Sequence, residues 1–470
     1  MDNFEIKEML TGLPIVNHHA GGIDVGSREM WVTYTDPEGH ICQFKSGCFT
    51  KDLDEIVCIF QKEKVTDVAM ESTGVYGGPL REKLEVSGIN VTVINPGMYK
   101  KPNIKDDSHD SSWIHLYHSV DLFKKSHFAP EHWRDLREYI HERDVIMVQK
   151  AVTLTRMQRQ LEMMNVKLQH EISDIEGVGA MKIIRAICGG ETDPEKLVSL
   201  LNLNLFKATK EDLVESLRGN YRTCLVNVLK EKLSEYDFFV SQMRKYEQYI
   251  ITILEEISKL EEQKRMVNET IASKGTNELK KNDKHKDPKT GKKAKKARKN
   301  EYSFDGPTFL CRILGIDLTK VEGFNDKTLL CILSVTGIDM SQWKSAQQFV
   351  SWLRLSPRPK KSANKVVGYD YSRTKNPATQ AFRLCAQSLH NSKSPLGQLY
   401  RKLLARKGHK TAIKAVARKL AILFYTLIKN GTEYSNEYFE TEKKKQIAKD
   451  EYKLQKLAKQ LGYNLEKIAS

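Results

Sequence analysis

A carboxylate inside an apolar strand is the feature that most constrains how this chain can fold. Asp24 lies between Ile23 and Val25 in the segment HHAGGIDVGSREMWVTYTDPEGH, residues 18–40. Two kinds of side chain then alternate, as they do in a strand: Met30, Val32 and Tyr34 against Trp31, Thr33 and Thr35. We therefore expect a β-hairpin with Asp24 in the middle of its first strand. Burying an unpaired carboxylate is costly, so Asp24 either has a partner or metal ion, or caps a turn at the strand end.

Strand and helix patterns alternate over the rest of residues 19–130. In chain order we expect a helix at Asp52–Lys62, a strand at Thr66–Met70, a helix at Pro79–Ser87, a strand at Ile89–Ile94 and a helix at Asp107–Val120. Strands that alternate with helices indicate a sheet with parallel pairs and covering helices. The first domain is therefore predicted to be α/β and to span residues 1–130.

The middle of the chain, residues 131–279, is predicted to be helical. Apolar residues recur at spacings of four and three along one long helix, residues 225–262: Leu229, Leu233, Tyr236, Val240, Met243, Tyr246, Ile250, Ile253, Ile257 and Leu260. This pattern is typical of a coiled-coil seam with a stammer. A coiled coil between protomers would make the protein at least a dimer. The alternatives are a seam that pairs with the helix at 131–169 of the same chain, or a long helix packed on its own domain.

Two further boundaries follow from composition. Residues 280–300 contain eleven Lys or Arg and no large apolar residue, which predicts a basic disordered linker over 280–305. A domain that we expect to be all-helical follows at 306–435, and a charged helical tail at 436–470. The linker either binds phosphates non-specifically or is a solvated spacer.

The overall charge suggests a polyanionic partner. The formal net charge is +16, from 76 Lys and Arg against 60 Asp and Glu, which points to nucleic acid or an anionic membrane. No apolar run is long enough to span a membrane. The eight cysteines are scattered without a CxxC pair, which argues against a zinc site or a disulfide framework. We therefore expect a cytoplasmic, nucleoid-associated protein with no membrane partner.

Four acids stand out by position. Asp24 lies in the first strand and Glu71 ends a later one, before a glycine-rich turn. Asp107 and Asp110 lie three residues apart at a helix start and so share one helix face. Acids on strand ends and on a helix start can converge at one edge of a sheet, and oxygen ligands suit Mg²⁺ or Mn²⁺. The alternative for Asp107 and Asp110 is ordinary capping of the first helical turn.

These acids lie in segments that resemble a known family. IDVGS, MESTGVYGGPLREKL, VINP and DSHDSSWI are similar to the N-terminal domain of the DEDD-class insertion-sequence transposases, the bridge-RNA-guided recombinases. The resemblance implies a RuvC-like, ribonuclease-H-type fold and a Mg²⁺-binding set of four acids: Asp24, Glu71, Asp107 and Asp110. The family usually has Thr where this chain has Asp106, so Asp106 and Asp107 are neighbouring candidates. The spacing to Asp110 and Trp113 favours Asp107.

The C-terminal part extends the resemblance. Similar segments include LRLSPRPKKSANKVVGYDYSRTKNPATQAFRLCAQSLHNSKSPLG and ARKGHKTAIKAVARKLAILFYTLIKNGTEY. In this family a serine in a motif close to S-G-G-K or S-A-G-K is a nucleophile. The corresponding residue here is Ser362, in the sequence Ser-Ala-Asn-Lys, where Asn364 replaces the usual glycine. Asn tolerates left-handed backbone better than most residues, so the turn is compatible with it.

Basic residues surround this serine. Residues 354–375 contain seven Lys or Arg and one acid, Asp370. The candidates for holding a phosphodiester are Lys360, Lys361, Lys365, Arg373 and Lys375. A serine hydroxyl needs a base or metal to become a good nucleophile, so the alternative is a loop serine that only contacts DNA. Ser356 and Ser372 are neighbouring candidate nucleophiles.

The resemblance implies a DNA transposase or recombinase. A structured RNA would pair with donor and target DNA, Ser362 would join DNA transiently, and acids and serine would meet between protomers of a dimer or tetramer. Two alternatives remain open. One is a metal-dependent, structure-selective DNA nuclease that resembles a Holliday-junction resolvase and does not use the serine. The other is a non-catalytic protein that binds nucleic acid, such as an RNA scaffold.

Overall fold

The structure is a computed structural model that describes residues 12–71, 74–94, 107–123, 127, 129–273, 301–362, 365–370, 376–435, 451–452 and 454–462. Most of the predicted linker, residues 280–300, lies outside these ranges, as does most of the predicted tail at 436–470. The chain divides into two compact units, Met1–Phe128 and Ala129–Ser470. The finer division into five segments stays a prediction.

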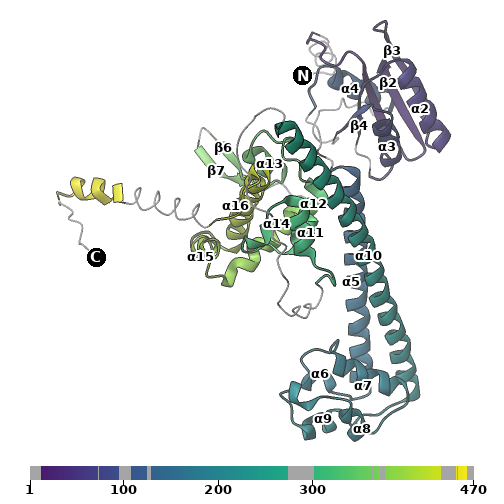
Figure 1. The fold of residues 1–470 in the computed structure, drawn as a ribbon, viewed down its shortest axis with the longest axis vertical. Coiled ribbons are helices and arrows are strands. Elements are labelled where there is room, and N and C mark those ends of the chain that lie inside the picture. Colours follow the sequence, from purple (N-terminus) through teal and green to yellow (C-terminus); the bar gives the residue numbers. More distant parts are fainter. Residues whose placement is uncertain are drawn as a thin grey trace. The chain divides into compact units, whose positions relative to one another are not determined.

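A mixed five-stranded sheet forms the centre of the first unit (Figure 1). Its strands are β1 (Ala20–Val25), β2 (Glu29–Thr35), β3 (Ile41–Gly47), β4 (Asp67–Glu71) and β5 (Asn90–Ile94). Their order across the sheet is β3-β2-β1-β4-β5, and the β1–β2 and β2–β3 pairs are antiparallel, whereas β1–β4 and β4–β5 are parallel. This sheet and its helices fit the ribonuclease-H-type fold.

The two faces of this sheet have different partners. Helices α2 (Thr50–Lys62) and α3 (Gly78–Val86) cover one face, where one apolar core joins Leu53, Ile56, Phe60, Leu80 and Leu84 to Ile23, Val25, Met30, Val32, Val68 and Met70. Helix α4 (Asp107–Ser119) covers the other face, where Ile114 packs with Ala69 and Ile94. Figure 1 shows α4 on one side of the sheet and α2 and α3 on the other.

Helix α4 lies unusually close to β1 because Gly22 has no side chain. A Cβ added at Gly22 would lie 2.3 Å from the backbone nitrogen of His115. Hydrogen bonds hold the helix there: the Thr33 and Ser111 hydroxyls lie 2.9 Å apart, and Thr35 Oγ1 lies 2.8 Å from His115 Nε2. The position of α4 therefore depends on directional polar contacts as well as apolar packing.

The second unit is built on two long antiparallel helices, α5 (Glu131–Met163) and α10 (Thr223–Ser273). At one end they pack against the short helices α6 (Leu168–Glu171), α7 (Val178–Cys188), α8 (Pro194–Ser199) and α9 (Lys210–Ser216). The short 3₁₀ helix η2 (Leu203–Leu205) lies between α8 and α9 in the chain. The predicted seam lies partly in this cluster, through Leu229 and Leu233, and partly in the next, through Ile250 and Ile257. Within the chain, α10 packs along α5, which is one of the three arrangements that the sequence left open. An intermolecular coiled coil stays a prediction.

The C-terminal part of this unit is mainly helical. It contains α11 (Gly306–Leu314), η3 (Leu318–Lys320), α12 (Asp326–Thr336), α13 (Ala346–Trp352), α14 (Pro377–Ser388), η4 (Leu389–Asn391), α15 (Pro395–Lys407) and α16 (His409–Asn430). Phe349, Phe382 and Phe424 are fully buried at its centre. Trp133, Leu136 and Ile140 of α5 belong to the same core, so these helices pack directly on the long pair.

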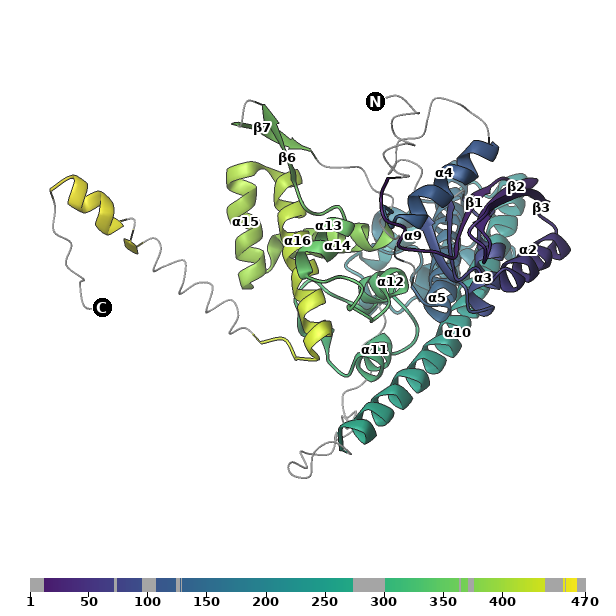
Figure 2. The same ribbon diagram turned by 90° about the horizontal axis from the view of Figure 1, so that it is seen from above.

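The expectation of an all-helical C-terminal domain was wrong in one place. Residues Arg358–Ser362 and Lys365–Asp370 form an antiparallel hairpin, β6–β7, that extends away from α13–α16 in Figure 2. Each strand is short and is stabilised mainly by pairing with the other, so the sequence pattern did not reveal the hairpin, although Val366 and Val367 are β-branched. Among the residues that the structure describes, none of the helices has the length and apolarity needed to cross a membrane.

A buried ion pair joins the two long helices, and its arginine also contacts residues 301 and 302, at the end of the predicted linker. The Arg143 side chain is fully buried, and its Nε and Nη2 lie 2.8 Å and 2.7 Å from Glu247 Oε1. Arg143 Nη2 also donates to the Glu301 carbonyl at 3.0 Å, and the guanidinium lies 4.4 Å from the centre of the Tyr302 ring. Arg143 thus fixes where the C-terminal part begins on the long helices.

Candidate acidic site and exposed serine

Asp24 and Glu71 lie on neighbouring parallel strands at the same height. The last recorded pair between β1 and β4 is Ile23 with Met70, and Asp24 and Glu71 are the next residues on each strand. Ile23 and Met70 point into the core under α2 and α3. Because side chains alternate along a strand, Asp24 and Glu71 point to the opposite face, which α4 covers. Glu71 is 9% exposed and Asp24 is half-buried.

The start of α4 is directed toward these two acids. His115 lies against Gly22, and one turn earlier Ser111 contacts Thr33, which pairs with Gly22. At the other end of α4, the Ser119 carbonyl accepts from the backbone nitrogen of Val16 at 2.8 Å, just before β1. The helix therefore runs opposite to β1. Residue 107 is one helical turn before Ser111, about 6 Å along the helix axis. Two residues of a strand span about the same length, so residue 107 lies level with Asp24, two residues after Gly22.

The four predicted acids thus lie on elements that meet at one end of the sheet. Asp107 and Asp110 occupy the first turn of α4, and the side chain of Asp110 is half-buried. The side chain of Asp107, and the whole of Asp106, lie outside the described residues. Carboxylate oxygens from two strand ends and a helix start are a donor set that suits Mg²⁺ or Mn²⁺.

The carboxylates of Asp24, Glu71 and Asp110 are not gathered into one tight group. Within the described ranges, the His, Cys, Asp and Glu side chains that do form a group of three with ligand atoms within 4.8 Å are Asp36, Glu38 and His40. That group lies at the exposed turn between β2 and β3, where Asp36 Oδ1 accepts from the backbone nitrogens of Glu38 and His40. These bonds stabilise the turn, so the group has a structural explanation without a metal.

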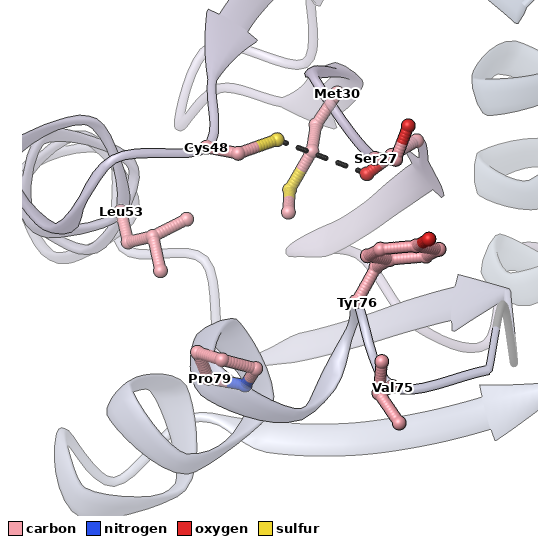
Figure 3. Close-up of a pocket in the computed structure, with 8 residues that line it drawn as sticks. Ser27, Met30, Cys48, Leu53, Val75, Tyr76 and Pro79 are labelled. Atoms are coloured by element: carbon pink, nitrogen blue, oxygen red, sulfur yellow. Dashed lines mark hydrogen bonds between the residues drawn. The ribbon is translucent and has the colours of Figure 1, made fainter.

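A pocket of about 220 Å³ opens at the same end of the strands but on the other face (Figure 3). Its lining consists of Gly26, Ser27, Met30, Cys48, Leu53, Val75, Tyr76 and Pro79. The Cys48 thiol donates to the Gly26 carbonyl at 3.7 Å, and burial raises the pKa of this thiol. With no acid in its lining, the pocket is separate from the acidic site.

A neutral histidine lies in the contact between α4 and the sheet. The pKa of His115 is lowered to about 4, first by burial and then by the neighbouring His118. Its ring bonds Thr35 and is 4% exposed. At neutral pH the His115 imidazole is therefore uncharged and adds no positive charge between α4 and the sheet.

Ser362 is exposed and is the last residue of β6, where it pairs with Lys365. Lys360 and Lys361 precede it on the same strand, and the side chains of these two lysines and of Lys365 lie outside the described residues. The predicted phosphate contacts Arg373 and Lys375 lie outside the described residues, as does Ser372. Ser356, the other alternative nucleophile, is half-buried in the loop before β6.

The pairing of Asp24 with Trp31 across β1 and β2 was not anticipated from the sequence. The alternation in β2 had already assigned Trp31 to the face opposite Met30 and Val32. The missing information was the strand register, which sets Trp31 beside an acid.

Comparisons with known families agree with this arrangement. A transposase family model of the DEDD type from IS110 elements matches residues 21–166, a range that contains all four acids. A second model, described as the transposase IS116/IS110/IS902 family, matches residues 317–401, which contain Ser362 and the five predicted basic contacts. A comparison with curated proteins finds no match.

The fold and the two matched segments define the class of protein: a transposase, an enzyme that acts on DNA. Both models describe transposases, and they match in order along one chain. The chain belongs to the IS110 family of insertion-sequence transposases.

Proposed function

We propose that this transposase cuts and rejoins the DNA of an insertion sequence through a transient phosphoserine bond at Ser362. The Ser362 oxygen attacks the scissile phosphorus, and the bond from phosphorus to the leaving deoxyribose oxygen breaks. That oxygen takes a proton, and its later attack on the phosphoserine reverses the step. The phosphoester energy is kept throughout, so rejoining needs no nucleotide cofactor.

The acids would bind the metal that this chemistry uses. Asp24, Glu71, Asp107 and Asp110 would hold Mg²⁺, and the ion would supply positive charge to offset that of the phosphate. The observation that most supports this role is that Asp24 and Glu71 share one sheet face with the start of α4. Lys360, Lys361, Lys365, Arg373 and Lys375 would hold the phosphodiester next to the serine and offset its developing charge.

A structured guide RNA is the second partner that we propose. Base pairing would then supply sequence specificity, while the protein would recognise backbone and shape. The net charge of +16 supports binding of both nucleic acids. The test is to purify the chain with RNA transcribed from the DNA beside its gene. Cleavage of donor and target DNA that depends on this RNA is expected, and equal cleavage without it would contradict RNA guidance.

The decisive test of the serine uses denaturing gels that detect protein joined to DNA. Native protein with Mg²⁺ should give an adduct, and Ser362→Ala should give none. Ser356→Ala is the matched control and should keep the adduct, since it removes a nearby hydroxyl outside the hairpin. Glu71→Gln should lower cleavage by about 100-fold or more, because it removes a charged ligand.

Two results would contradict this proposal in different ways. If Ser362→Ala still cleaves DNA and native protein never forms an adduct, the chain is a metal-dependent nuclease that does not use the serine. If native protein is as inactive as Glu71→Gln on DNA junctions with the cognate RNA, the chain is a non-catalytic protein that binds nucleic acid.

A further inference from the structure

Trp31 and Lys45 continue the line of the acids across the sheet. In the strand register, Asp24 of β1 pairs with Trp31 of β2, and Trp31 pairs with Lys45 of β3. Side chains of directly paired residues point to the same face, with Cβ atoms about 4.5–5.5 Å apart. Glu71, Asp24, Trp31 and Lys45 therefore form one row on the face that α4 covers.

Trp31 has an unusual place for a tryptophan. The neighbouring residues on its face, Thr33 and Thr35, are covered by α4 through Ser111 and His115. Trp31 lies at the height where α4 begins, and it is only half-buried. It belongs to none of the apolar clusters found among the described residues. Within the described residues, this large aromatic ring beside an acid therefore takes no part in an apolar core.

Lys45 adds to this row a positive charge that an anionic ligand can bind. Its Nζ lies 5.9 Å from the centre of the Trp31 ring and 2.7 Å from Glu29 Oε2. The side chains of Lys45 and Glu29 are 49% and 48% exposed. An ion pair this exposed contributes little to stability, so Lys45 can exchange Glu29 for another anion at small cost.

We propose that Trp31 and Lys45 bind the DNA strand that leads into the acidic site, an inference that rests on the proposed function. Trp31 stacks on a base or sugar of that strand, and Lys45 binds a phosphate close to the one that is cut. Lys45 lies two strand spacings from Asp24, about 10 Å. It is near enough to hold the same strand and far enough to leave the acids to the metal.

The chemistry of the two side chains fits a strand of any sequence. Every base has a flat face, so stacking on Trp31 tolerates sequence changes, as guided recognition requires. Lys45 also brings a positive charge to a region where carboxylates repel DNA. Glu29 competes with phosphate for Lys45. Removing the charge of Glu29 should therefore strengthen DNA binding, whereas removing that of Lys45 should weaken it.

The test measures binding of fluorescein-labelled single-stranded DNA to the full chain, with Ca²⁺ in place of Mg²⁺. Trp31→Leu should weaken binding about tenfold, and Trp31→Phe should keep part of the affinity. Lys45→Gln should weaken binding and reduce the slope of log K against log salt by about one. Glu29→Gln should tighten binding about two- to fivefold, because Lys45 loses its competitor.

Lys62→Gln is the matched control. Lys62 lies on α2, on the opposite face of the sheet, and its side chain is 81% exposed. This variant should bind DNA as native protein does. Native affinity in both Trp31→Leu and Lys45→Gln would overturn the proposal, as would weaker binding by Glu29→Gln. A loss confined to the same strand made as RNA would assign the row to RNA and also overturn it.

Asp24→Asn separates this inference from the proposed function. It should abolish cleavage with Mg²⁺ while its DNA binding still depends on Trp31. If the native protein binds DNA through Trp31 and Lys45 but never cuts it, the proposed function fails and the binding row stands. If cleavage is normal in Trp31→Leu at every DNA concentration, the row fails and the proposed function stands.

Discussion

The contact between Gly22 and α4 offers the sharpest test of how the acids are positioned. Gly22→Ala adds one methyl group, whose carbon would lie 2.3 Å, 2.6 Å and 2.7 Å from the N, Cα and Cβ atoms of His115. Two of these atoms belong to the backbone, so no rotamer change relieves the clash. Ordinary contact between such atoms needs about 3.5 Å, and α4 must therefore retreat by about 1 Å.

That displacement has two consequences of different size. Overpacking of this kind costs about 1–3 kcal/mol. Weakening the Thr33–Ser111 and Thr35–His115 hydrogen bonds costs about 1 kcal/mol each. The expected loss of stability is thus about 3–5 kcal/mol. The start of α4 moves with the helix, and a shift of about 1 Å in a catalytic group can lower the rate about 100-fold.

Native-state hydrogen exchange in β1 and β4 measures the first effect, and DNA cleavage at saturating Mg²⁺ measures the second. Gly78→Ala is the control, because a Cβ at Gly78 meets no atom within 4 Å and the residue lies in the first turn of α3. It should be neutral or slightly stabilising. If Gly22→Ala matched Gly78→Ala in both measurements, the close seating of α4 and its role in placing the acids would be refuted.

Two further predictions concern the stability of the two units. Arg143→Ala should destabilise the helical unit by about 3–5 kcal/mol because it leaves Glu247 buried and unpaired; urea unfolding followed by circular dichroism measures this, and the double variant Arg143→Met, Glu247→Leu should recover most of it. Lowering the pH should destabilise the first unit, because the His115 pKa of about 4 is below its ordinary value of 6.5, so protons favour the unfolded chain. Above pH 6.5, His115 is neutral in both states and does not lower the free energy of unfolding. As the pH falls from 6.5 toward 4, the free energy of unfolding decreases, by ~3 kcal/mol at most. A His115→Gln variant with the same pH dependence as native protein would contradict this assignment.

Local patterns were sufficient to predict most elements of the first unit. The predicted helix at Asp52–Lys62 is α2, Thr50–Lys62, because Leu53, Ile56 and Phe60 recur at helical spacing and are buried. The strand that ends near Glu71 and the hairpin around Asp24 follow from alternation in the same way. The mixed sheet fits the fold that the family resemblance implied.

Long-range register was the part that the sequence could not supply. Residues 41–47 did not reveal β3, since none of its residues is fully buried and its apolar face is short, with only Cys42 and Phe44. Without β3 and its register, Lys45 cannot be placed beside Trp31 and Asp24. The β6–β7 hairpin was missed for a related reason, because two short strands stabilise each other mainly by pairing. The family motif made Ser362 the candidate nucleophile, although its position at the end of a strand did not follow from the motif.

The two faces of the first sheet show why acids are tolerated there. One face is apolar from Ile23 to Met70 and excludes water under α2 and α3. The other joins α4 largely by hydroxyl, amide and imidazole contacts, including Gln43 Nε2 to Ser111 Oγ at 3.0 Å. A carboxylate on the apolar face would have to give up its hydration without compensation. On the polar face, Asp24 and Glu71 lie on the same side of the sheet as these hydrogen-bonding groups, so a sheet whose faces differ in this way can carry acids at one edge without weakening its own core.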